Sequence, residues 1–148
     1  MFRNLASDDV EALLSFFRSL TEQDRCFFHP HLFDAKTAQG ICRNPGKDIF
    51  AAGFQYSDIK AYGMLRGWND GFEVPRLGIA TGPSARGHGW SDGLMDYLHQ
   101  AARDAGASRV ELKVDVRNKA AIALYRRHGY QFPKKFPNSP DTIAWRSL

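Results

Sequence analysis

Apolar residues recur at helical spacing near the beginning of the chain. Ser7 is a suitable N-cap for this helix, and a short strand over residues 2–5 is expected to precede it. A second, weaker helix is predicted over residues 34–42, and the aromatic segment 21–33 between the two is expected to be irregular. The apolar face of the first helix consists of Val10, Leu13, Leu14, Phe17 and Leu20.

The middle of the chain has the pattern of extended strands. Residues 49–54 and 59–68 predict a β-hairpin. The turn Asn69-Asp70-Gly71 then predicts a reversal into a further strand over residues 73–81, which ends at Gly82-Pro83. The central part of the fold is therefore expected to be a sheet built from consecutive strands.

The second half of the chain alternates between helix and strand patterns. A helix that begins near Gly89 has apolar positions at helical spacing and ends at Gly106, which is a suitable C-terminal cap. Over residues 110–116 apolar and charged residues alternate, which is the period of a strand. Asn118 can cap a last helix that ends at Gly129, and short strands are expected near residues 130–132 and 142–147.

The predicted order of elements is β-α-α-β-β-β-α-β-α-β-β. Hairpins followed by a β-α-β unit favour an α/β fold with a mixed central sheet and helices on its faces. The same order argues against a doubly wound parallel sheet. A length of 148 residues fits one compact domain, and no internal repeat or linker divides it.

Composition and charge exclude some classes of protein without selecting a function. Hydrophobic residues make up 43% of the chain and charged residues 24%, which argues against extensive disorder. The net charge of +4, from 20 basic and 16 acidic residues, suits an anionic ligand as well as nucleic acid. Because no run of like charges marks a nucleic-acid tail, we expect no nucleic-acid partner.

Cysteine content and hydropathy indicate a cytoplasmic protein. Cys26 and Cys42 are expected to be reduced thiols, with a disulfide as the weaker alternative. Residues 1–10 lack the apolar stretch of a signal peptide, and no apolar run approaches the ~18 residues of a membrane span. We therefore expect no membrane partner. Nor do the histidines and cysteines form a recognisable zinc set, so no metal is expected.

The most informative local motif is the glycine-rich turn Arg86-Gly87-His88-Gly89-Trp90-Ser91. It joins a predicted strand to a predicted helix, so unpaired N–H groups and the positive end of the helix dipole would meet there. Such a turn binds phosphate or pyrophosphate, and Arg86 can add a charge-assisted hydrogen bond. The dinucleotide fingerprint does not fit, because Asp92 stands where its third glycine is required, and no Walker A loop occurs. The alternative is that the glycines only permit a tight turn.

A second motif, Asn-x-x-Ala-x-x-Leu-Tyr-x-x-x-Gly, runs from Asn118 to Gly129. Asn118 and Tyr125 are two helical turns apart and therefore lie on about the same side of the predicted helix. A tyrosine with an ordinary pKa of about 10 is protonated at pH 7 and can donate a proton to a leaving thiolate. The alternative is a core tyrosine whose hydroxyl reaches the surface.

Together the two motifs resemble the GNAT N-acetyltransferase family over residues 73–132. In that family Arg/Gln-x-x-Gly-x-Gly/Ala binds the CoA pyrophosphate, and this chain has Arg86 at the first position and Ser91 at the last, where glycine or alanine is usual. The resemblance implies a mixed central sheet of about six or seven strands flanked by about four helices. It also implies a single acyltransferase domain over residues 1–148.

The resemblance further implies a reaction and its binding site. Acetyl-CoA would be the acyl donor and a primary amine the acceptor, with direct transfer and no metal. Tyr125 corresponds to the family's tyrosine that protonates the CoA sulfur. One backbone N–H of the strand before the turn would stabilise the oxyanion. The implied cofactor-binding residues are Ile79, Ala80, Thr81, Arg86, Gly87, His88, Gly89, Trp90, Ser91 and Asn118.

The general base and the acceptor stay open at this stage. Family members that modify the N-termini of ribosomal proteins have a glutamate where this chain has Lys113, so that base is absent here. His29, His31, Glu73 and Asp115 are the other candidates for the base. A small amine, an amino sugar and a peptide are all candidate acceptors, and the acyl chain length is not specified.

Three further questions stay open: whether the chain is catalytic, what the aromatic segment does, and whether the protein forms a dimer. The uncertain base and the serine at position 91 motivate one alternative, a non-catalytic module that binds acyl-CoA or another protein. The aromatic segment 27–33 would wall the acceptor cavity, or else form a rigid loop. Pairing of relatives through their C-terminal strands raises the expectation of a homodimer.

Overall fold

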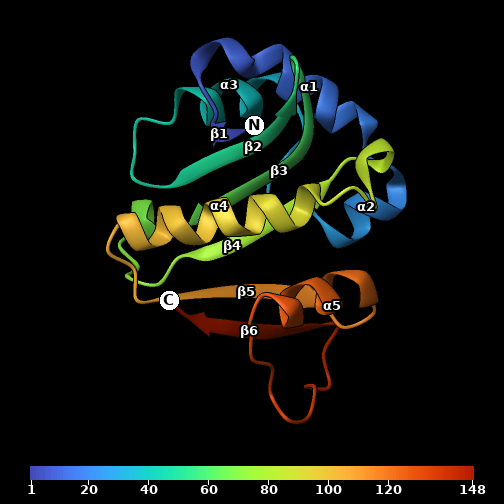
Figure 1. The fold of residues 1–148 in the computed structure, drawn as a ribbon, viewed down its shortest axis with the longest axis vertical. Helices are drawn as coiled ribbons and strands as arrows, with labels where there is room; N and C mark the ends of the chain where they lie inside the picture. Colours follow the sequence, from blue (N-terminus) through green and yellow to red (C-terminus); the bar gives the residue numbers. More distant parts are fainter.

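A six-stranded mixed sheet forms the centre of the computed structural model, which describes residues 1–148 (Figure 1). The strands lie side by side in chain order, and every neighbouring pair is antiparallel except β4 and β5, which are parallel. Their bounds are β1 (Phe2–Asn4), β2 (Ile49–Gln55), β3 (Asp58–Arg66), β4 (Arg76–Thr81), β5 (Arg109–Asp115) and β6 (Asp141–Ser147).

Helices cover both faces of this sheet. Helices α1 and α3 pack on one face, and α4 and α5 pack on the other, where α4 lies in front of the central strands in Figure 1. No helix has both the length and the apolar character of a membrane span. The helices are α1 (Val10–Ser19), α2 (Glu22–Phe27), α3 (Ala35–Arg43), α4 (Trp90–Asp104) and α5 (Lys119–Arg127), with single turns η1 (Ser7–Asp9), η2 (Trp68–Asp70) and η3 (Pro83–Ala85).

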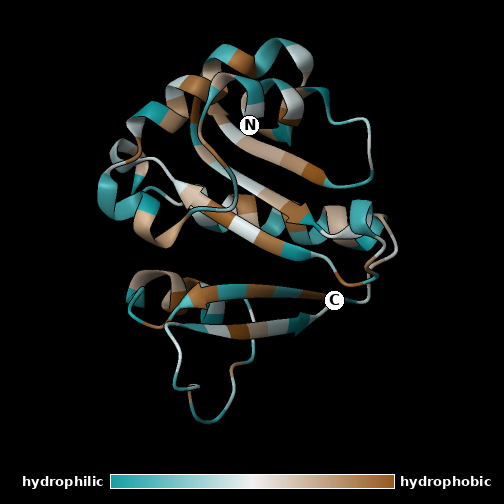
Figure 2. Ribbon diagram, turned by 180° about the vertical axis from the view of Figure 1, so that it is seen from behind, coloured by the Kyte–Doolittle hydropathy of each residue, from teal (hydrophilic) through white to brown (hydrophobic).

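The alternation of side chains in β3 divides the core into two layers. Tyr62 and Met64 contact the α1–α3 layer, whereas Ala61 and Leu65 belong to the layer under α4 and α5. At Gly63 an added Cβ would lie 2.8 Å from a methyl of Leu98, so glycine allows α4 to pack closely on the sheet. Figure 2 shows the hydrophobic residues running along the central strands.

Strands β4 and β5 pair only where they begin. Arg76 is the register partner of Glu111, whose N–H donates to the Pro75 carbonyl at 3.0 Å, and no later pair joins the two strands. On the other edge of β4, the Gly82 N–H donates to the Lys60 carbonyl of the β3–β4 ladder. Bonded and non-bonded pairs alternate along such a ladder, so Ile79 and Thr81 direct their N–H and C=O groups towards β5.

The mixed sheet with flanking helices confirms the predicted fold class, but three local expectations were wrong. Ser7 does not cap α1, because it lies within the turn η1 and Asp9 is the residue that precedes the helix. Segment 21–33 contains α2, which begins with a capping box: Thr21 Oγ1 accepts from the Asp24 N–H at 3.1 Å, and the Asp24 carboxylate accepts from the Thr21 N–H at 2.9 Å. The strand expected at 130–132 is a single bridge between Gln131 and Trp145.

The cysteines are both free, as the sequence predicted. Cys26 is exposed, and Cys42 is buried among the side chains of the α1–α3 layer. Burial raises the pKa of the Cys42 thiol to about 11, so this thiol is protonated and inert at neutral pH.

Candidate active site

The gap between β4 and β5 opens into a cavity of about 640 Å³. Its walls come from β4, from the turn before α4, from α5 and from α2. This volume lies within the range of small-molecule and cofactor sites. The parting of the two parallel strands therefore creates a site in the middle of the sheet, and the backbone of Ile79 and Thr81 faces it.

The glycine-rich turn forms one end of this cavity. Gly87 and Gly89 have φ values of 78° and 81°, in the left-handed region that favours glycine, and a Cβ at either would meet nothing within 4 Å. No backbone N–H from Arg86 to Asp92 donates a hydrogen bond to another residue. The free amides lie at the N-terminus of α4, where the helix dipole also favours an anion.

Not every residue of this turn lines the cavity. Trp90 lines it, and the Trp90 ring also packs edge-on against Phe2, with 5.7 Å between ring centroids. His88 does not line the cavity. The other residues that the sequence assigned to cofactor binding, together with Tyr125, are all brought to its wall.

Arg86 is held by a partner that sequence reasoning missed. Its guanidinium forms an ion pair with the Asp24 carboxylate of α2. The Asp24 side chain is 12% exposed and that of Arg86 is 53% exposed, and both residues line the cavity. These residues are far apart in sequence and no motif connects them, so only the tertiary structure could identify the pair.

The beginning and middle of α5 supply the opposite wall. Asn118 caps this helix, because its side-chain oxygen accepts the Ala121 N–H at 3.2 Å. Tyr125 is buried, yet its hydroxyl bonds to no residue and is not sealed from solvent. Burial raises the pKa of Tyr125 above its ordinary value. The phenol is therefore neutral, and it is free to donate a hydrogen bond into the cavity.

A second cavity of about 310 Å³ adjoins the first around β4 and β5. Phe27, Phe28, Gly78 and Lys113 are among the residues that line both cavities. The aromatic segment is divided between two roles. Residues 27–30 line the second cavity, while His31 and Phe33 pack into the aromatic cluster of the α1–α3 layer.

Three of the four candidates for the general base are unsuitable in the structure. Two bonds from Arg117, at 2.7 and 3.0 Å, lower the pKa of Asp115 to about 2, which makes this carboxylate a poor base. Glu73 is exposed and lines neither cavity. Both ring nitrogens of His31 are occupied, Nε2 by the Tyr62 hydroxyl at 2.9 Å and Nδ1 by the Leu32 carbonyl at 2.7 Å. Burial also lowers the pKa of His31.

His29 alone combines a place in the second cavity with an unused ring nitrogen. Its Nδ1 donates to the Arg25 carbonyl at 3.3 Å, because a carbonyl can only accept. This assigns the proton to Nδ1 and leaves the Nε2 lone pair without a partner among the protein groups. A neutral imidazole of this tautomer can accept a proton at Nε2.

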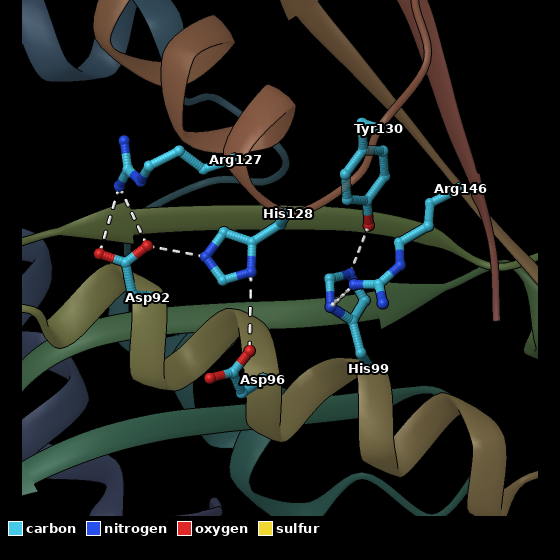
Figure 3. Close-up of polar contacts among 7 residues, drawn as sticks. All are labelled: Asp92, Asp96, His99, Arg127, His128, Tyr130 and Arg146. Carbon is cyan, nitrogen blue, oxygen red and sulfur yellow. Dashed lines mark hydrogen bonds and ion pairs between the residues drawn. The ribbon is translucent and has the colours of Figure 1, made fainter.

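A polar network behind the cavity ties α4 to α5 and β6 (Figure 3). Asp92, in the first turn of α4, accepts from Arg127 at 3.0 Å and from His128 at 2.7 Å. Two helical turns further along α4, His99 meets Tyr130 at 2.8 Å and Arg146 at 2.9 Å (Figure 3). The network fixes the end of α5 relative to the beginning of α4, and so holds the two halves of the site in place.

Comparisons with known proteins agree with this geometry. A model of the Acetyltransferase (GNAT) family matches residues 13–130. No curated protein sequence matches the chain. Among solved structures, the chain is similar to the GNAT domain of S. lividans PAT, with a TM-score of 0.85 and 17% identity over 99% of this chain and 89% of that one.

Two other solved structures illustrate the same likeness. The ribosomal-protein-alanine N-acetyltransferase from Brucella melitensis has a TM-score of 0.82 and 20% identity, over 100% of this chain and 99% of that one. The PaiA N-acetyltransferase from Thermoplasma acidophilum, in complex with coenzyme A, has a TM-score of 0.80 and 15% identity, over 100% and 98%. At such identities these likenesses establish the fold.

Proposed function

The chain belongs to the GNAT family of acetyltransferases, and on that premise we propose that it transfers an acetyl group from acetyl-CoA to a primary amine. Residues 1–148 would act as one acyltransferase domain, and the acceptor would be a small molecule or a peptide. One observation carries the proposal. A single cavity has unbonded amides at one end and the unbonded Tyr125 hydroxyl in its wall.

The cavity suits the successive parts of an acyl-CoA. The free N–H groups from Arg86 to Asp92 and the guanidinium of Arg86 would bind the diphosphate. The free edge of β4, at Ile79 and Thr81, would pair with the amides of the pantetheine arm as a neighbouring strand does. Asn118 would hold the arm from the other side, with the amide nitrogen that its capping bond leaves unused.

The reaction would proceed by direct attack of the amine on the thioester carbonyl. The new C–N bond places negative charge on the carbonyl oxygen, which an N–H of the β4 edge would stabilise. The C=O bond then re-forms as the C–S bond breaks, and the electron pair of the C–S bond goes to sulfur, to which Tyr125 would donate a hydrogen bond. The nitrogen gives up its surplus proton to the departing thiolate or to water. Because the pKa of this phenol is raised, hydrogen bonding to the developing thiolate contributes more than complete proton transfer.

We propose His29 as the general base. The attacking amine must first lose a proton if it arrives as an ammonium, and His29, with its free Nε2, lines the second cavity, where we place the acceptor. Among the candidates, His29 is the one whose lone pair is available and whose side chain reaches a cavity. A water molecule would carry the proton from the amine to Nε2 of His29 where the two nitrogens are not in direct contact.

Calorimetry and thiol release together test the proposed function. Acetyl-CoA should bind with a measurable affinity, and addition of a suitable amine should release free CoA thiol at a rate that depends on that amine. Binding without acceptor-dependent thiol release across a broad amine panel would favour the non-catalytic module instead. Failure to bind acetyl-CoA at millimolar concentration would remove both alternatives.

A further inference from the structure

The 310 Å³ cavity on the acceptor side has a wall rich in unpaired positive charge. Arg66 at the end of β3, Arg76 at the beginning of β4 and Lys113 on β5 all line it. None of them forms an ion pair with a carboxylate anywhere in the molecule. Three cations from three strands therefore converge on one small volume without counter-charges of their own.

The arrangement of the two arginines is unfavourable for the fold alone. Arg66 and Arg76 are register partners on adjacent antiparallel strands, so their side chains leave the same face of the sheet directly opposite each other. Like charges in this position destabilise a sheet. Glu111, the neighbour of Arg76 on β5, is paired with Arg109 at 3.5 Å and does not relieve this repulsion. A bound anion would relieve it.

The carboxylates of the cavity leave the positive charge in excess. Asp115 and Asp141 are the acidic residues in its wall. Asp115 is already neutralised by two hydrogen bonds from Arg117, so only Asp141 opposes the three cations. The cavity does not include the turn that would bind the CoA diphosphate, so the excess charge does not serve that group.

From this juxtaposition we infer that the acceptor is a small amine that also carries an anionic group, a carboxylate or a phosphate. The inference rests on the proposed function and specifies its acceptor. Arg66 and Arg76 bind the anion, while the amine points towards Gly78, where the second cavity meets the first. Phe27, Phe28 and Met64 line the same cavity and contact the apolar part of the acceptor. The cavity volume is at the lower end of the range for small-molecule sites, which suits a molecule the size of an amino acid.

Matched acceptors test the inference with saturating acetyl-CoA. Phenylalanine is compared with phenylalaninamide and phenethylamine, which keep the amine and the ring but lack the carboxylate. Phosphoethanolamine is compared with ethanolamine, so that the two arms distinguish a carboxylate from a phosphate. In at least one arm, kcat/KM for the anionic acceptor should exceed that of its neutral counterparts about tenfold or more, as expected for a charge-assisted hydrogen bond.

Variants of the arginines separate anion binding from a general defect. Arg76→Gln and Arg66→Gln should each raise the KM of the preferred anionic acceptor about tenfold, leave its kcat within about threefold, and leave the neutral counterpart within about twofold. Arg76→Lys keeps the charge and should recover part of the loss. Arg18→Gln, at an exposed unpaired arginine of α1 outside both cavities, is the matched control and should change nothing.

The outcomes distinguish this inference from the function on which it rests. If neutral amines are acetylated as well as their anionic counterparts in both arms, the inference is wrong and the acetyltransferase assignment stands. The inference also fails if the arginine variants impair neutral and anionic acceptors equally. If acetyl-CoA binds but no amine releases thiol, the acetyltransferase assignment falls and this inference falls with it.

Discussion

The buried tyrosines of this fold differ in what their hydroxyl groups contact. The Tyr62 hydroxyl meets Nε2 of His31 at 2.9 Å, and the Tyr130 hydroxyl meets Nε2 of His99 at 2.8 Å. Tyr125 is buried to a similar degree, but no residue satisfies its hydroxyl. A sulfur atom bound in the cavity would supply the hydrogen-bond partner that the Tyr125 phenol lacks.

We expect Tyr125→Phe to lower kcat about 10- to 100-fold while the dissociation constant for acetyl-CoA stays within about twofold. The substitution removes only the O–H, which interacts with sulfur most strongly when that atom is charged. Steady-state thiol release and calorimetry measure the two effects. Tyr56→Phe, at a side chain that is 96% exposed, is the control. A wild-type rate in Tyr125→Phe would exclude this tyrosine from the chemistry.

The same reasoning applied to His29, whose Nε2 has no partner among the protein groups, predicts a loss of rate. His29→Gln should lower kcat/KM about 100-fold at neutral pH, within the usual contribution of a general base. Steady-state thiol release is the measurement. A rate close to that of the wild type would mean that another group removes the proton from the amine.

At the scale of elements, α2 acts as a cover over the turn that would bind the diphosphate. Asp24 is part of the capping box of α2 and also holds Arg86, so the same carboxylate stabilises the helix and occupies the guanidinium. An incoming diphosphate must compete with this carboxylate for Arg86, and the negative charge of Asp24 would oppose it.

Asp24→Asn should therefore tighten acetyl-CoA binding. A partly exposed ion pair contributes about 0.2–1 kcal/mol, so the dissociation constant should fall up to about fivefold. Calorimetry at two salt concentrations measures the change and its electrostatic part. Asp58→Asn, at an exposed position outside the cavity, removes the same charge and should have little effect. Weaker binding in Asp24→Asn would show that Asp24 stabilises the site, through the cap of α2, more than it competes with the diphosphate for Arg86.

The elements and the residues of the site were predictable to different degrees. The glycine-rich turn and the Asn118–Tyr125 helix were predicted because the motif and the helical period are both local. The short α2 was missed because six residues with few apolar positions give no periodic signal, although Thr21 and Asp24 have the spacing of a capping box. The second cavity depends on strand register, which places Arg66 opposite Arg76, and a single sequence does not specify register.

At the scale of the whole molecule, the site depends on contacts between distant segments. The two halves of the 640 Å³ cavity lie on either side of the gap between β4 and β5, and these strands share only one register pair. Side-chain contacts therefore link the two halves, because the polar network of Figure 3 joins α4 to the end of α5 and to β6. The stability of the fold and the geometry of the site should therefore respond together when this network is protonated.

His99 makes this link measurable as a pH dependence of stability. Burial, aided by the nearby charge of Arg146, lowers the pKa of His99 to about 3, against about 6.5 in an unfolded chain. Between these values the unfolded chain binds the proton more tightly, so the free energy of unfolding falls as the pH falls from 6.5 towards 3. At pH 5.0 the loss due to His99 is about 2 kcal/mol. His31, whose pKa burial also lowers, contributes with the same sign.

Urea unfolding at pH 7.5 and 5.0 compares the wild type with His99→Gln. Glutamine can accept from Arg146 and donate to Tyr130 as the neutral imidazole does, but it does not titrate. The variant should therefore lose less stability than the wild type between the two pH values, by about 2 kcal/mol, whatever its stability at pH 7.5. The carboxylates that pair in the fold titrate mainly below pH 5 and affect both proteins alike. Equal losses would mean that His99 takes up its proton equally in the folded and the unfolded protein over this range, and that the bond from Arg146 does not hold it neutral.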